Sequence, residues 1–117
     1  MASNQERGDG VTVGAVTTTV VSLPLPRNLV AHVHVVVVAR DSLDAGSVFE
    51  LSAAIRSGPV VAIPLGVVAI PFTRADPTMV LAAATLVVTP VAVEVRVTGV
   101  VGRRIQWAAE IESLVVG

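Results

Sequence analysis

The sequence predicts an all-β fold: a single-domain β-sandwich or jelly roll of about seven or eight antiparallel strands. The first observation is composition, since Val, Ile and Thr supply 27, 5 and 9 of the 117 residues. Such β-branched side chains are stiff at χ1 and pack well on a pleated sheet. The second is that segments of alternating apolar and polar residues are separated by turn residues at regular spacing. The length corresponds to one domain.

The first ten residues are polar and include Glu6, Arg7 and Asp9, so we expect residues 1–10 to form a flexible or partner-ordered arm. The sandwich domain is then residues 11–117. Residues 11–22 are expected to form its first strand. An extended connector should follow at residues 23–26, where two prolines cannot donate hydrogen bonds to a neighbouring strand.

A hairpin is predicted next, with strands at residues 29–40 and 47–57 joined by a turn at 41–46. The turn segment contains two Asp, a Ser and a Gly, which are typical turn residues. In the second strand, alternation separates an apolar face from a polar one. The apolar face is Phe49, Leu51, Ala53 and Ile55, and the polar face is Glu50, Ser52 and Arg56.

Residues 60–72 are apolar but are interrupted by Pro64, Gly66 and Pro71, which indicates an edge strand, a bulge or two short strands. We expect a subunit interface on this edge segment and on the outward faces of the Val-rich strands. The candidate interface residues of the edge segment are Val60, Val61, Ile63, Val67, Val68, Ile70 and Phe72. Residues 78–89 should form a further strand, because Val87, Val88 and Thr89 end it.

The last two strands, residues 91–98 and 104–112, alternate most clearly. We predict that they form a closing hairpin around 99–102, with Thr98 opposite Arg104 and Val95 beside Trp107 on the buried face. Trp107, Phe49 and Val95 are the expected core anchors.

Composition excludes several classes of function. Eight Arg oppose nine acidic residues without a basic stripe, so a nucleic-acid partner is not expected. The absence of Cys excludes thiol catalysis and thiolate metal sites. The uncharged stretch at residues 77–93 is shorter than the ~20 residues of a spanning helix, so no membrane span is expected. The polar start does not resemble a signal peptide.

Two histidines are the main candidates for chemistry. His32 and His34 lie two residues apart on a predicted strand, so both should point to one face. They could bind a metal together with Glu50 across the hairpin, in a cupin-like arrangement. However, Val38 and Ala39 stand where a cupin motif has its glutamate. We therefore favour two polar residues on an exposed or interfacial face. No nucleophile elbow or phosphate-binding motif occurs, and we expect neither enzymatic activity nor a cofactor.

Hydrophobic residues make up 53% of the chain and charged residues 15%, and the mean hydropathy is +0.79. A monomer of 12.0 kDa has too little interior to bury this much apolar surface. Because large exposed apolar patches usually mark interfaces, we expect self-association or burial in a larger assembly.

Residues 93–99 (VEVRVTG) and 102–112 (GRRIQWAAEIE) resemble the closing hairpin of small β-rich bacteriophage virion proteins, and the hairpin at 35–57 is similar to the one before it. The resemblance implies a capsid decoration (cement) protein: a homotrimer that is assembled in the host cytoplasm and binds the major capsid protein on the capsid surface. Two alternatives remain open at this point. They are a phage tail or fibre receptor-binding β-domain and a cupin-like metal-binding protein using His32 and His34.

Overall fold

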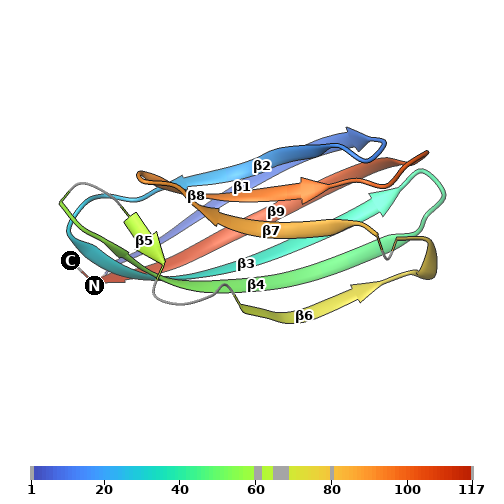
Figure 1. The fold of residues 1–117 in the computed structure, drawn as a ribbon. Helices are drawn as coiled ribbons and strands as arrows, with labels where there is room; N and C mark the ends of the chain where they lie inside the picture. The colour runs from blue at the N-terminus through green and yellow to red at the C-terminus, as the bar shows by residue number, and fades with distance from the viewer. Residues whose placement is uncertain (1, 60–61, 65–68, 80, 117) are drawn as a thin grey trace.

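The computed structural model describes residues 2–59, 62–64, 69–79 and 81–116. They form an elongated sandwich of two antiparallel sheets, with extents of 45 × 22 × 21 Å (Figure 1). This confirms the predicted all-β sandwich. The single helical element in the described ranges is a short 3₁₀ turn, η1 (Pro77–Met79).

The two sheets differ in size. The large sheet has the order β1-β9-β3-β4, and both β5 and β6 pair with the far side of β4. The small sheet has the order β2-β8-β7. The large-sheet strands are β1 (Ala2–Val13), β3 (Leu29–Asp41), β4 (Gly46–Ser57), β5 (Ala62–Pro64), β6 (Ala69–Ala75) and β9 (Arg104–Val116). The small-sheet strands are β2 (Thr17–Pro24), β7 (Ala83–Val88) and β8 (Ala92–Thr98).

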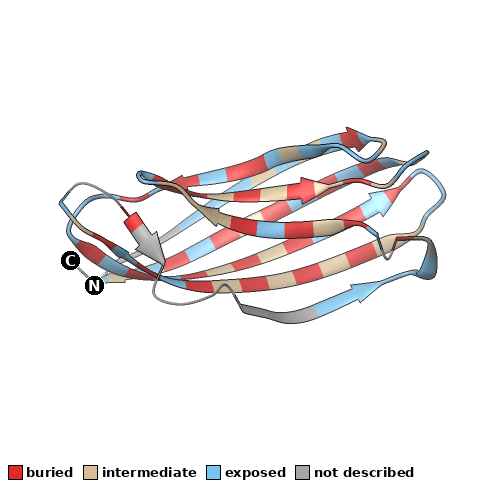
Figure 2. Ribbon diagram, in the orientation of Figure 1, coloured by how far each residue is buried: buried red, intermediate tan, exposed pale blue. Residues whose placement is uncertain are grey.

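Alternation along each strand builds the core between the sheets, as Figure 2 shows by the alternating colours. The hairpin of β3 and β4 follows the predicted pattern, with Phe49, Leu51, Ala53 and Ile55 buried. Trp107 and Phe49 are buried on the same sheet, and their rings stack with centroids 6.4 Å apart. The Trp107 Nε1–H donates to Thr12 Oγ1 at 2.9 Å, which satisfies the indole donor inside the core.

The structure corrects the prediction for the N-terminal segment. Residues 1–10 were expected to be an arm, but residues 2–13 form β1, which pairs with β9 from Ala2↔Val115 to Val13↔Arg104. The predicted strand 11–22 is consequently divided at residues 14–16. The physical reason is that a β-ladder is made by backbone groups, so a polar segment can supply it while its side chains face water.

The predicted closing hairpin is also wrong. β8 pairs with β2 and β7 in the small sheet, whereas β9 pairs with β1 and β3 in the large sheet. Residues 99–103 therefore cross between the sheets instead of turning within one. Val95 and Trp107 are both buried, but they enter the core from different sheets. Alternation cannot distinguish these arrangements, because each strand buries the same face in either one.

The proline-containing segment forms two short edge strands, β5 and β6, which is one of the arrangements its sequence predicted. Of the candidate interface residues there, Val60, Val61, Val67 and Val68 lie outside the described residues. Ile63, Ile70 and Phe72 belong to these two strands, and the backbones of Ile63 and Phe72 lie opposite Arg56 and Glu50. Residues 78–89 form a strand only in their second half, as β7.

Asp41 joins the turn of the β3–β4 hairpin to the crossing segment. Its buried carboxylate accepts hydrogen bonds from the N–H groups of Leu43 at 2.8 Å and Ala45 at 2.9 Å. The other carboxylate oxygen lies 2.7 Å from Arg103 Nη1. Burial acts to raise the pKa of Asp41, but the two N–H donors and the Arg103 guanidinium outweigh burial and hold the pKa below its usual value.

A glycine allows β1 to lie directly against β2. A Cβ atom at Gly8 would overlap the carbonyl oxygen of Val20. Val20 is the extra residue of a bulge in β2, since Thr19 lies opposite Arg96 while Val21 lies opposite Val95. The two sheets are therefore closed along this side by backbone contact rather than by large side chains.

We predict that Gly8→Ala lowers the free energy of unfolding by about 1–3 kcal/mol, because the new methyl group must displace the β2 backbone. Urea denaturation followed by Trp107 fluorescence measures the change. Gly46→Ala is the matched control: its Cβ would lie 3.4 Å from the Ala39 carbonyl oxygen, so we expect a change within about 1 kcal/mol. Equal effects of the two substitutions would contradict the close approach of β1 and β2.

We also predict an acid-dependent contribution from Asp41. A carboxylate whose pKa is lower in the folded state stabilises that state above its unfolded pKa, and the contribution is lost as pH falls through the folded value, below about pH 4. The difference in urea midpoint between the wild type and Asp41→Asn should therefore shrink between pH 6 and pH 3. A difference that stays constant with pH would contradict this assignment.

Candidate interaction surface

The outer faces of the two sheets have different chemistry. The strands of the small sheet present hydroxyl groups and one ion pair to solvent: Thr17 and Thr98 are hydrogen-bonded at 2.9 Å, and Glu94 pairs with Arg96 at 2.8 Å. Thr19, Ser22 and Thr85 are exposed on the same side. This face is well suited to water.

The large sheet instead exposes aliphatic side chains on its outer face. Every exposed large hydrophobic residue found within a described strand lies there, and each is between 45% and 68% exposed. They come from three adjacent strands, β1, β9 and β3. These residues are Val11, Val13, Val30, Val38, Leu114 and Val116. An outer face of this kind is typical of a surface that is covered in an assembly.

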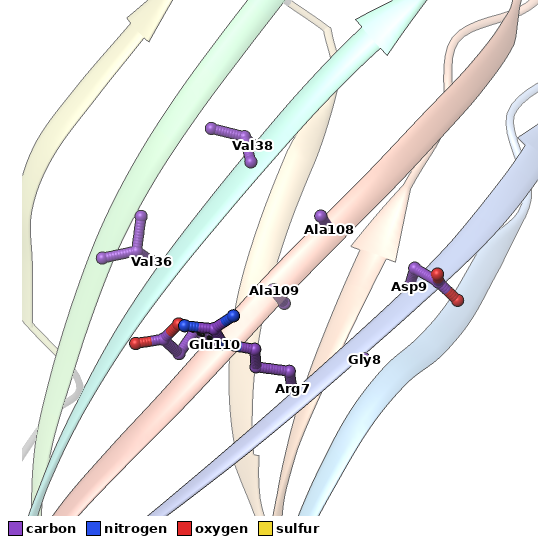
Figure 3. Close-up of a pocket in the computed structure, with 8 residues that line it drawn as sticks. All are labelled: Arg7, Gly8, Asp9, Val36, Val38, Ala108, Ala109 and Glu110. Atoms are coloured by element: carbon purple, nitrogen blue, oxygen red, sulfur yellow. Dashed lines mark ion pairs between the residues drawn. The ribbon is translucent and has the colours of Figure 1, made fainter.

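A shallow hollow of about 690 Å³ lies at the centre of this face (Figure 3). The strand register places Ala108 between Asp9 on β1 and Val38 on β3. The hollow forms because the Ala108 side chain is short, and Val36 and Val38 line its apolar side. A charged pair lies next to Val36, because Glu110 is opposite Val36 in the strand register and its Oε2 lies 2.7 Å from Arg7 Nε. The hollow thus offers an aliphatic surface beside a pair of opposite charges.

Both histidines project from the same outer face, at neighbouring outward positions of β3. His34 Nε2 lies 4.0 Å from Glu50 Oε1, and both side chains are about two-fifths exposed. His32 instead lies opposite Ala54 on β4 and Leu114 on β9. Within the ranges that the structure describes, no three His, Asp or Glu side chains converge as a metal site requires. The geometry therefore brings together His34 and Glu50 but not His32.

The sequence predicts an interface on the outward faces of the Val-rich strands, but it does not identify the individual residues of this surface. Val38 could have been found, because it alternates with the buried residues of β3. Ala108 and the residues of β1 could not, since their position depends on β9 lying between β1 and β3.

A second group of exposed aliphatic residues occupies the loops at one end of the sandwich. Val16, Leu43, Leu81 and Val101 are 49% to 80% exposed. Backbone hydrogen bonds join three of these loops to one another or to the base of β9: Gly99 N to Val16 O, Gly14 N to Arg103 O and Ser42 N to Arg104 O. The opposite end holds the start of β1 and the end of β9 (Figure 1).

Comparison with known proteins leaves the family open. No protein-family model and no curated protein matches the chain. Among solved structures, the chain is similar to the tailspike protein of Acinetobacter phage vB_ApiP_P1, with 13% sequence identity and a TM-score of 0.35. The match covers 98% of this chain and 21% of the tailspike, so the chain spans about a fifth of that protein's length. A similarity of this size establishes neither family nor function. No helix in the described ranges has the length and apolarity to span a membrane.

Proposed function

We propose that this chain is a structural virion protein, most specifically a capsid decoration protein that binds its lattice through the outer face of the large sheet. The observation that carries the proposal is the concentration of exposed aliphatic side chains on that face. It agrees with the expectation from composition that the protein is covered in an assembly.

The energetics favour a docking role for this face. Completing the burial of a half-exposed valine or leucine contributes about 1 kcal/mol, so six such residues together contribute several kcal/mol. Association also costs translational and rotational entropy. Many weak, repeated contacts on a symmetric lattice offset that cost, since each bound copy bridges neighbouring coat subunits.

The proposed mechanism is mechanical. The two-sheet sandwich supplies rigidity, and the bound face adds buried interface between coat subunits, which raises the resistance of the lattice to heat or expansion. We propose that the protein acts as a homotrimer on the capsid surface, with the major capsid protein as its partner and without enzymatic activity. The sequence resemblance at residues 35–57 supports a phage capsid as the assembly, whereas residues 91–115 do not form the hairpin on which the rest of the resemblance depended.

A phage tail or fibre β-domain is the second candidate, and one observation favours it. The aliphatic loops containing Leu43, Leu81 and Val101 lie at the end opposite the start of β1 and the end of β9. A module joined to a shaft at one end presents its opposite end to a receptor. In that case the loops, rather than the sheet face, would be the binding site.

We predict that Val38→Glu weakens binding to undecorated capsids of the encoding phage by at least about tenfold, because the docked face would have to bury a charge beside Glu110. Co-sedimentation of protein with capsids measures the binding. Thr85→Glu, which adds the same charge to the outer face of the small sheet, is the matched control and should bind like the wild type.

Light scattering coupled to size exclusion tests the trimer separately, with an expected mass near three times 12.0 kDa. Wild-type protein that fails to sediment with capsids would overturn the decoration proposal. If Leu43→Glu then abolished binding to host cells while Val38→Glu did not, the tail or fibre alternative would replace it.

A further inference from the structure

We propose that β1 is an exchangeable strand, which in the assembled protein pairs with β9 of a second copy of this chain. This inference deepens the proposed function, because it names the element that joins the copies. It rests on that function for the presence of neighbouring copies.

First, β1 is held in the sheet mainly by its backbone. It pairs with β9 along its entire length of 12 residues. In contrast, its inward side buries little side chain: Glu6 is exposed, Gly8 and Gly10 have no side chain, and Thr12 is fully buried. Leaving the sheet therefore uncovers a row of hydrogen-bonding groups on β9 but removes little apolar volume from the core.

Second, the register of β1 is only weakly specified by its own side chains. A strand with one apolar face must keep its register, because a shift of one residue turns that face to solvent. Residues 5–10 present polar side chains or glycine on both faces, and such strands are prone to alternate pairing and exchange. The interactions that do fix its position are the pairs Arg7–Glu110 and Gln5–Glu110 and the bond from Trp107 to Thr12.

All of these interactions join β1 to β9, so a neighbouring copy offers the same partners. Gly8 also lies against the carbonyl of Val20 in β2. Because β2 is not exchanged, the neighbouring copy offers this contact as well. An exchanged β1 would consequently make every contact that it makes within one chain. Exchange of an identical element is a low-cost route to a symmetric oligomer.

Third, the hinge between β1 and β2 is short. Gly14 N donates to Arg103 O at 3.0 Å, and this bond continues the pairing of β1 with β9. Val16 O accepts from Gly99 N at 3.0 Å, and this bond begins the pairing of β2 with β8. Ala15 alone separates these two bonds. Gly14 adopts a positive φ of 77° to turn the chain between the sheets. Short hinges of this kind favour exchange, because extending the hinge removes a tight turn while the strand contacts are regained in the partner.

The test is a cysteine crosslink in the full chain, which contains no cysteine of its own. Asp9 and Ala108 lie directly opposite each other, and both are exposed on the outer face. Opposed antiparallel residues have Cα atoms about 4.5–5.5 Å apart, within disulfide range. In Asp9→Cys/Ala108→Cys, an exchanged strand gives disulfide-linked dimers and trimers on a non-reducing denaturing gel. A strand that stays on its own β9 gives single chains with an internal disulfide.

Two controls define the background of this test. His34→Cys/Ser52→Cys joins the two strands of the β3–β4 hairpin and should crosslink within single chains. Asp9→Cys alone should give few linked chains, which excludes random collision. If the first pair impairs folding, Val11→Cys/Gln106→Cys provides an equivalent trap, since these residues are also opposed and exposed.

The expected result is a crosslink between chains. Lengthening the hinge by about four Gly and Ser residues after Ala15 should move that crosslink into single chains, because β1 can then return to its own β9. Internal disulfides alone, in protein that light scattering shows to be an oligomer, would overturn the exchange and leave the proposed function intact. Protein that is monomeric at every concentration, with internal disulfides and without capsid binding, would overturn both.

Discussion

The large sheet depends on β9, which is hydrogen-bonded to β1 on one side and to β3 on the other. Without β9, β1 has no partner in its sheet, and the backbone groups on one edge of β3 have no strand to pair with. β9 also supplies Trp107, Ile105 and Ile111 to the core and Ala108 and Glu110 to the outer face. One strand therefore determines how the interior is packed and which side chains meet on the surface.

The sequence predicted the features that are properties of single strands. The Val-rich run and the alternation located β3 and β4 within one residue of their ends, and alternation identified the buried face of β4. Proline placed residues 60–72 at a sheet edge, where β5 and β6 lie. Asp41 and Gly46 marked the turn between β3 and β4, and Asp41 does bind the N–H groups of that turn.

Features that depend on which strands pair were not predictable in the same way. Residues 99–103 contain glycines that suit a hairpin equally well, and their crossing is stabilised by Arg103, whose partner Asp41 lies 62 residues away. The prediction for the N-terminal segment was wrong for a different reason. The polarity of its side chains does not show whether its backbone pairs with another strand. Gly8 was a usable signal there, since a glycine within a strand indicates close approach of another backbone, here that of Val20. Which residues meet on the outer face also depends on the strand pairing, so this grouping was not predicted.

The two outer faces differ in polarity, so the two sides of the molecule are not equivalent as binding surfaces. Threonines and the Glu94–Arg96 pair keep the small sheet hydrated, whereas Val38 and Leu114 make the large sheet costly to leave exposed. A domain built this way attaches by one side and shows a polar side outward. In the proposed role on a capsid lattice, that arrangement would restrict growth to a single added layer.

The distance in sequence between β1 and β9 has a consequence during synthesis. Thr12 and Trp107 are 95 residues apart, so β1 leaves the ribosome long before the strand that pairs with it. At about 5–20 residues per second, this leaves β1 unpaired for several seconds. On a polysome, neighbouring nascent chains are present throughout that interval, and a β9 completed on one of them is as suitable a partner as the chain's own. The order of translation therefore gives the first strand an opportunity to pair between chains before it can pair within one.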